Sequence, residues 1–166
     1  KGTISLHTGS IGYCEQNAWI RNASVRENII FGRPFDEDLY RRVIDECCLE
    51  RDLALLPFGD ETMIGEKGAT ISGGQKQRIG IARVFYAQPD LVLFDDPFSA
   101  VDATVARNLF YSIKDGLLAG KTRIIATHNR SILDEVDLIV VMDKGRIKVV
   151  GNYDEIMRSV DPRLAG

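Results

Sequence analysis

The chain has 166 residues and a hydrophobic content of 45%, which is enough for one domain with a buried core. Its 21 basic and 24 acidic residues give a net charge of −3 and are scattered along the sequence, so the chain lacks the basic footprint of a protein that binds nucleic acid or anionic lipid. Its apolar runs, such as residues 138–142, are far shorter than the ~20 residues that span a bilayer, and we therefore expect a soluble domain.

The first half of the chain is predicted to pass from short strands to helices. Polar and apolar side chains alternate in residues 3–6 and 10–14, which predicts two strands around a turn at Thr8-Gly9. Within residues 22–88 the apolar side chains recur at helical spacing. The helices expected in this stretch lie at about residues 36–47, 49–56 and 72–88.

In the second half, strands alternate with helices. Residues 91–94 form a continuous apolar run, which is typical of a strand buried on both faces. Polar capping residues predict that helices begin at Asp102, Ser131 and Asn152. Further strands are expected at residues 122–126, 138–142 and 146–150, the last two as a hairpin. This order predicts an α/β fold with a mostly parallel sheet and a mostly helical insert ahead of residues 91–94.

The sequence Ser72-Gly73-Gly74-Gln75 opens the last helix of the insert. Ser72 and Gln75 fit a capping box, which by itself marks only the start of a helix. Two glycines in a first helical turn cost roughly 1 kcal/mol each relative to alanine, so a capping role leaves Gly73 and Gly74 unexplained. Glycine lets an anion approach the backbone N–H groups at the positive end of a helix, and the motif therefore predicts a phosphate-binding site.

Two carboxylates, Asp95 and Asp96, follow the apolar run of residues 91–94. The carboxyl ends of parallel strands border the ligand crevice of such sheets. An aspartate at the position of Asp95 can hold Mg²⁺ through water, and the adjacent Asp96 can polarise an attacking water. The alternative is a pair of solvated carboxylates that cap the turn before Pro97.

Two further polar residues follow predicted strands. His128 comes after residues 122–126, a position suited to sensing a terminal phosphate, although a histidine at a strand end more often makes a structural hydrogen bond. Gln16 comes after residues 10–14 and, taken alone, is an ordinary loop residue.

No phosphate-cradling loop of the form G-x-x-x-x-G-K-[ST] occurs in the 166 residues. The nearest match, residues 116–122, has Asp115 where the first glycine belongs. It also follows a predicted helix and opens a strand, whereas such a loop follows a strand and opens a helix. We therefore reject this segment as a phosphate site.

Together, these motifs resemble those of ATP-binding-cassette (ABC) proteins across essentially the whole chain. The signature motif, Walker B strand, D-loop, H-loop and Q-loop glutamine are similar to residues 71–75 (ISGGQ), 91–95 (LVLFD), 99–102 (SAVD), 127–128 (TH) and Gln16. Three more segments resemble the multidrug-resistance-associated (C) subfamily of exporters, specifically its first nucleotide-binding domain. These segments are residues 17–20 (NAWI), 27–32 (ENIIFG) and 65–68 (GEKG).

The resemblance implies a P-loop NTPase-like cassette core with an inserted helical subdomain, and ATP and Mg²⁺ as its cofactors. By this resemblance, Asp95 would hold Mg²⁺ through water, and Gln16 would contact the metal and couple to the transmembrane domain. His128 would touch the γ-phosphate, and Asp102 would bridge two cassettes in a head-to-tail dimer. The γ-phosphate of ATP on the partner cassette would be bound by Ser72, Gly73, Gly74 and Gln75.

The chain departs from the family pattern at three points. Asp96 stands where a catalytic glutamate is usual, and a carboxylate withdrawn by about an ångström can cost ~10²-fold in rate. We therefore expect this chain's own site to occlude ATP more than it hydrolyses it. Glu15 replaces a proline that often precedes the Q-loop glutamine. The N-terminal part of the core, with the P-loop and the aromatic segment that stacks on adenine, is expected upstream of Lys1.

The resemblance divides the chain into residues 1–21 with the Q-loop, residues 22–88 as the helical subdomain with the signature, and residues 89–166 as the C-terminal part of the ATPase core. It places the chain at the cytoplasmic face of a membrane. The implied partners are a second nucleotide-binding domain and the transmembrane domains of the same transporter, and nucleic acid is not among them.

The preferred interpretation is part of a cassette that powers export by ATP hydrolysis. One alternative is a non-catalytic regulatory cassette fragment that binds a partner cassette. A third is an ABC ATPase of the chromosome-maintenance kind, which the lack of sustained heptads in residues 22–88 disfavours. Without a phosphate-cradling motif, the chain alone is expected to bind ATP more weakly than millimolar, so ATPase activity is assigned to the parent protein.

Overall fold

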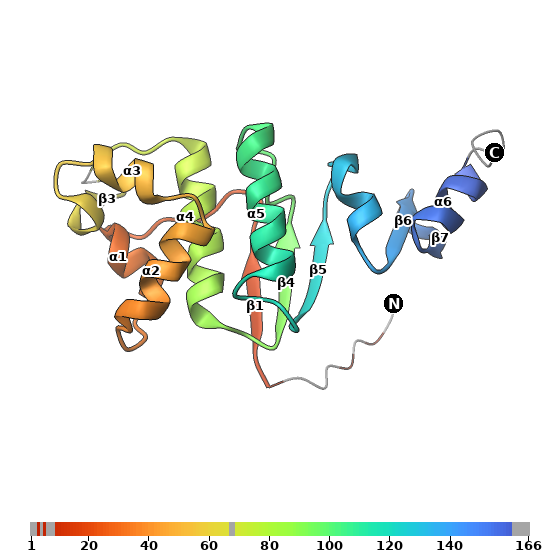
Figure 1. Ribbon diagram of the computed structural model, residues 1–166, viewed down its shortest axis with the longest axis horizontal. Coiled ribbons are helices and arrows are strands. Elements are labelled where there is room, and N and C mark those ends of the chain that lie inside the picture. Colours follow the sequence, from red (N-terminus) through yellow and green to blue (C-terminus); the bar gives the residue numbers. More distant parts are fainter. Residues whose placement is uncertain (1–2, 4, 6–8, 67–68, 161–166) are drawn as a thin grey trace. The chain divides into compact units, whose positions relative to one another are not determined.

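The computed structural model describes residues 3, 5, 9–66 and 69–160, and its contacts divide the chain into two compact units. The first unit is Lys1–Thr127 and the second is His128–Gly166. Helices and strands of both are labelled in Figure 1. The mixed α/β composition with a parallel sheet confirms the predicted fold class. The division into residues 1–21, 22–88 and 89–166 stays a prediction.

The first unit is built on a parallel three-stranded sheet with the order β1-β4-β5. Its strands are β1 (Ile11–Cys14), β4 (Leu91–Asp95) and β5 (Thr122–Ala126), and all three agree with the predicted strands. Cys14 pairs with Phe94, and Phe94 pairs with Ile125, so the three carboxyl ends lie side by side. The sheet therefore brings the segments that follow these strands to one edge.

Half of the predicted strand at residues 3–6 lies outside the described residues. Thr3 and Ser5 are described and are not in a strand, whereas residues 4 and 6, and Thr8 of the predicted turn, lie outside that part of the chain.

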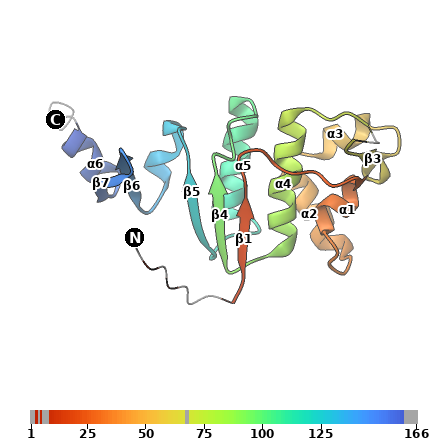
Figure 2. The same cartoon turned by 180° about the vertical axis from the view of Figure 1, so that it is seen from behind.

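Helices cover one face of this sheet. Helix α5 (Ala103–Asp115) is in front of the strands in Figure 1 and behind them in Figure 2, and α4 (Gly73–Ala87) contacts β1. Val92 and Phe94 are buried beneath the helices. The opposite face carries Ile11, Tyr13 and Ile124, which are 46%, 59% and 57% exposed. On this face of β4, Leu91 is buried but Leu93, which pairs with Tyr13, is only half-buried, so the expectation that β4 is buried on both faces is met in full on one face only.

The helical part lies between β1 and β4. It contains β2 (Ala23–Ser24), α1 (Val25–Ile30), α2 (Glu37–Glu46), α3 (Glu50–Leu55), a 3-10 helix (Gly59–Glu61) and β3 (Met63–Ile64) ahead of α4. Helices α1 and α2 both pack against α4. The predicted helices are confirmed, whereas α1 and the short antiparallel pair of β2 with β3 were not predicted.

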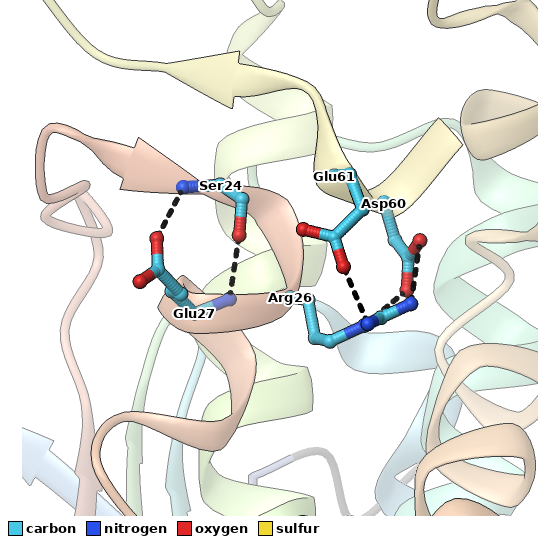
Figure 3. A network of polar contacts seen from close by, with 5 residues as sticks. All are labelled: Ser24, Arg26, Glu27, Asp60 and Glu61. Atoms are coloured by element: carbon cyan, nitrogen blue, oxygen red, sulfur yellow. Dashed lines mark hydrogen bonds and ion pairs between the residues drawn. The ribbon is translucent and has the colours of Figure 1, made fainter. Parts of the chain in front are cut away.

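Polar contacts hold the start of this part together, as Figure 3 shows. Ser24 and Glu27 form a capping box at the start of α1, in which each side chain accepts a hydrogen bond from the other's backbone N–H group. Arg26 forms ion pairs with Asp60, at 2.9 Å, and with Glu61. These ion pairs tie α1 to the 3-10 helix.

The second unit contains a 3-10 helix (Arg130–Glu135), β6 (Ile139–Asp143), β7 (Arg146–Gly151) and α6 (Tyr153–Val160). Strands β6 and β7 form the predicted hairpin, and Lys144 and Gly145 between them have φ values of 49° and 74°, as a tight hairpin turn requires. Asn152 and Glu155 exchange hydrogen bonds, which confirms the predicted cap of α6.

One predicted cap is wrong. A helix was expected to begin at the capping residue Ser131, but the 3-10 helix begins one residue earlier and is capped by Asn129. The Asn129 side-chain oxygen accepts a hydrogen bond from the Ser131 N–H group at 3.0 Å. Among all the helices that the structure describes, none is long and apolar enough to cross a membrane.

Candidate functional site

The predicted capping box stands at the start of α4. The Ser72 hydroxyl oxygen accepts a hydrogen bond from the Gln75 N–H group at 3.2 Å, and Gln75 Oε1 accepts one from the Ser72 N–H group at 2.8 Å. These contacts leave the N–H groups of the first turn, at Gly73 and Gly74, without an acceptor inside the helix, as at any helix start. The first turn of α4 is therefore fixed in place with its donors directed out of the helix end.

The two glycines of this turn have different surroundings. A Cβ atom added to Gly74 would lie 2.8 Å from the carbonyl oxygen of Ala100, so the segment ahead of α5 requires glycine there. A Cβ atom added to Gly73 would meet nothing within 4 Å. Close packing therefore explains why residue 74 is glycine. It does not explain Gly73, which faces open space in front of the helix.

That open space is a hollow of about 420 Å³ between the starts of α4 and α5. It is lined by Ser72, Gly73, Gly74, Arg78, Ala100, Val101, Asp102 and Val105. Both helix starts carry partial positive charge, which favours an anion. Asp102 offsets this charge at α5, because its Oδ1 accepts hydrogen bonds from the Thr104 and Val105 N–H groups at 3.0 Å. The α4 end, open at Gly73, thus fits a phosphate group.

Gln75 does not line the hollow, although it belongs to the same motif. Its Nε2 instead donates a hydrogen bond to Asp52 Oδ1 on α3, at 2.9 Å. The structure thus brings three of the four predicted phosphate-binding residues, together with Asp102, to one surface, and directs the fourth into the helical part.

A second group of polar residues lies at the carboxyl ends of β1 and β4. Asp95 is exposed, and its Oδ2 accepts a hydrogen bond from the Tyr13 hydroxyl at 3.4 Å. Desolvation, and then the charge of Asp95, raise the pKa of Tyr13, so this phenol keeps its proton. Tyr13 was not predicted from the sequence. It could have been found because it lies in the alternating strand β1, which pairs directly with β4.

Asp96 connects the ends of all three strands. Its N–H group donates to the carbonyl of Ala126 at 2.7 Å. Its carboxylate accepts hydrogen bonds from Gln16 Nε2 and from the Thr127 hydroxyl, both at 3.4 Å. The residue has a φ of 43°, a left-handed conformation that is uncommon outside glycine and clusters at functional sites. Gln16 and Thr127 thus lie beside the Asp96 carboxylate, and the contact of Gln16 with a metal stays a prediction.

These side chains fit a magnesium ion. Mg²⁺ prefers oxygen ligands and is usually held by one or two carboxylates, with water and phosphate oxygens completing its shell. Asp95, Asp96 and the amide oxygen of Gln16 offer such a set. Within the described ranges no group of three or more histidine, cysteine, aspartate or glutamate side chains could hold a metal ion, so this set has two carboxylates and one amide, and water and phosphate oxygens would complete it.

His128 is the first residue of the second unit and is exposed. It directly follows Thr127, the last residue of the first unit, whose hydroxyl reaches Asp96. The structure describes the two units separately, so the predicted role of His128 stays a prediction.

Comparison with known proteins identifies the family. A family model described as ABC transporter matches residues 2–99. The ABC-type transporter cicA of Emericella nidulans is 53% identical over 160 residues, which are 96% of this chain and 11% of that protein. ABC transporter C family member 7 of Arabidopsis thaliana is 50% identical over 151 residues (91% and 10%), and ATP-binding cassette sub-family C member 3 of Rattus norvegicus is 43% identical over 160 residues (95% and 10%). The chain thus spans about a tenth of the length of these relatives. Since the family model covers more than half of the chain, including the motifs at residues 72–75 and 91–95, the chain belongs to the ABC transporter family.

Proposed function

We propose that the chain is part of the ATP-binding and hydrolysing domain of an ABC exporter of the C subfamily, in its first cassette. The observation that carries this proposal is the hollow at the start of α4, where Gly73 is open to a ligand and packing explains only Gly74. In this proposal Ser72, Gly73 and Gly74 bind the γ-phosphate of ATP held by a second cassette, in a head-to-tail dimer. Gln75 supports them from within the capping box.

The chain's own site is proposed at the carboxyl ends of the strands. Asp95 would hold Mg²⁺ through water, with Gln16 at its side and Asp96 as the acid nearest the attacking water. His128 would contact the γ-phosphate. Asp96 is held by Gln16 and Thr127 and carries a side chain one methylene shorter than glutamate. We therefore propose that this site occludes ATP more than it hydrolyses it, while the signature completes a competent site on the partner.

The proposed partners are a second nucleotide-binding domain and the transmembrane domains of the same transporter, at the cytoplasmic face of a membrane. The names of the relatives support a transporter, and a chain that spans about a tenth of their length leaves room for such domains in the parent protein. A regulatory cassette without catalysis is the second candidate, and Asp96 in place of a glutamate is the observation that favours it.

The experiment that tests the proposal is Gly73→Asp in the full-length protein that carries this chain. The added side chain meets no atom of the chain within 4 Å of its Cβ, and an acidic residue suits the first turn of a helix, so stability is preserved. A carboxylate facing a phosphate costs several kcal/mol, so MgATP turnover should fall by about 100-fold.

Gly73→Asn is the matched control, because it has the same size without the charge, and its loss of turnover should be much smaller. A Gly73→Asp protein that is folded and hydrolyses MgATP at the wild-type rate would contradict the proposal. The regulatory alternative predicts a different pair of results. The wild-type protein would show no detectable turnover, and Gly73→Asp would abolish its nucleotide-dependent association with the second cassette.

A further inference from the structure

Asp52, on the short helix α3, contacts residues of α4 with both of its carboxylate oxygens. Its Oδ1 accepts the hydrogen bond from Gln75 Nε2 at 2.9 Å, and its Oδ2 lies 2.6 Å from Arg78 Nη1. The side chains of Asp52 and Arg78 are 18% and 14% exposed, so water screens this pair only weakly. One carboxylate therefore contacts two residues of the α4 N-terminal segment that are three positions apart.

The contact with Gln75 reaches the phosphate-facing turn directly. Gln75 Oε1 accepts from the Ser72 N–H group, which leaves the Nε2 end of the amide to face Asp52. An amide held at both ends has one orientation. Asp52 thus orients the Gln75 side chain, and Gln75 in turn holds the backbone at Ser72, next to Gly73.

The contact with Arg78 reaches the same turn by a second path. Arg78 lines the hollow, its Nε donates to the carbonyl of Gly74 at 3.3 Å, and its Nη1 donates to the carbonyl of Cys48 at 2.5 Å. With Asp52 present, the guanidinium group is directed toward Cys48 and the C-terminal side of α2. Its charge is thereby neutralised within the helical part.

We infer that Asp52 is a positioning residue of the signature motif, which holds Gln75 and Arg78 so that the first turn of α4 faces the partner's nucleotide. This inference rests on the proposed function. Helix α3 has no side-chain cap and no fully buried residue, and its Asp52 side chain contacts α4 through Gln75 and Arg78. Asp52 touches no substrate atom in this scheme and acts through the two residues that it orients.

The chain contains a matched ion pair that leaves α4 untouched. Asp60, 21% exposed, pairs with Arg26 on α1, as Figure 3 shows, and so resembles Asp52 in burial and partner type. If Asp52 only stabilised the helical part, Asp52→Asn and Asp60→Asn would lower stability and turnover in the same proportion.

The test is MgATP turnover and thermal stability of the full-length protein that carries this chain, in the variants Asp52→Asn and Asp60→Asn. Asp52→Asn should lower kcat about ten-fold or more, because displacing a contact group by about an ångström can lower the rate by ~10²-fold. Its KM for MgATP should change less than two-fold, since the signature contacts only the γ-phosphate. Asp60→Asn should change kcat less than two-fold at a similar loss of stability.

A double-mutant cycle separates positioning from general destabilisation. If Asp52 acts through Gln75, then Asp52→Ala should lower kcat less in a Gln75→Ala background than in wild type. If Asp52→Ala folds poorly, the shape-preserving Asp52→Asn supplies the same cycle. Independent losses from Asp52 and Gln75, or equal effects of Asp52→Asn and Asp60→Asn on kcat, would overturn the inference. If Gly73→Asp abolishes turnover while Asp52→Asn behaves as Asp60→Asn does, the inference fails alone; if Gly73→Asp is fully active, the proposed function fails with it.

Discussion

Asp96 combines a strained backbone with a shared side chain. A φ of 43° in a residue other than glycine costs of order 1 kcal/mol, and the surrounding contacts must compensate for it. The Ala126 carbonyl, Gln16 and Thr127 provide these contacts. The strain turns the chain sharply after β4 and leaves the Asp96 carboxylate between the ends of β1 and β5.

The length of this side chain is the basis of a prediction. Asp96→Glu moves the carboxylate outward by about an ångström, toward the place where we expect the attacking water, and should raise hydrolysis at this site by up to ~10²-fold. Single-site turnover in the full-length transporter measures the effect. Asp95→Glu is the control, and it should lower turnover because it displaces the proposed metal ligand. An Asp96→Glu protein with unchanged single-site hydrolysis would argue against a degenerate acid.

Residue-scale contacts were the least predictable from the sequence. The sequence placed Asp95, Asp96 and Gln16 after strands, and only the resemblance to ABC proteins implied that Gln16 lies near the metal site. Asp52 could not be found in the same way, because its partners Gln75 and Arg78 are 23 and 26 positions away and only tertiary packing brings them together.

Helix α4 carries the phosphate-facing turn at one end and supports the segment after β1 along its side. Gly80, in its middle, is buried, and an added Cβ would lie 2.7 Å from the Cβ of Ala18 and 3.8 Å from the Cys14 sulfur. Gly80 thus allows the chain that follows Gln16 to pass close over the helix. The position of Gln16 therefore depends on α4 as well as on β1.

Gly80→Ala tests this close packing. The substitution gains roughly 1 kcal/mol of helix propensity, but overpacking a tight contact costs about 1–3 kcal/mol, so we expect a net loss of stability. Chemical unfolding of the chain measures the difference. Gly73→Ala on the same helix, with no atom within 4 Å of its Cβ, should cause no loss. A chain stabilised by Gly80→Ala would show that the Ala18 segment moves away at little cost.

Elements with strong local signals were predicted well. The boundaries of α4 and α5 follow from the capping residues Ser72 and Asp102, and these contacts are local in sequence. Strands β2 and β3 have two residues each, too few for a periodic pattern, and their pairing joins segments about 40 positions apart. The cap at Asn129 was misassigned to Ser131 because both residue types cap helices and they are two positions apart.

At the scale of the whole molecule, the first unit has a one-sided sheet. Its helices cover the face with Val92 and Phe94, whereas Ile11, Tyr13 and Ile124 lie exposed on the other face. Both groups of proposed nucleotide contacts, at the α4 start and at the strand ends, are open surfaces. Each offers part of the contacts that a nucleotide needs.

The helix starts at the α4 hollow can supply only part of the binding free energy that ATP needs. A Kd of 1 mM requires about −4.1 kcal/mol, whereas a helix end contributes typically 0.3–1 kcal/mol and at most ~2 kcal/mol toward an anion. The start of α5 is already offset by Asp102, so α4 contributes most of the available charge. The 166-residue sequence contains no G-x-x-x-x-G-K-[ST] loop to add to it.

We therefore predict a Kd above 1 mM for MgATP in a calorimetric titration of the chain alone. The Gly73→Asp chain serves as the control, because any weak signal from the α4 hollow should vanish in it. Saturable binding in the micromolar range would mean that the chain holds the nucleotide through contacts other than these helix ends.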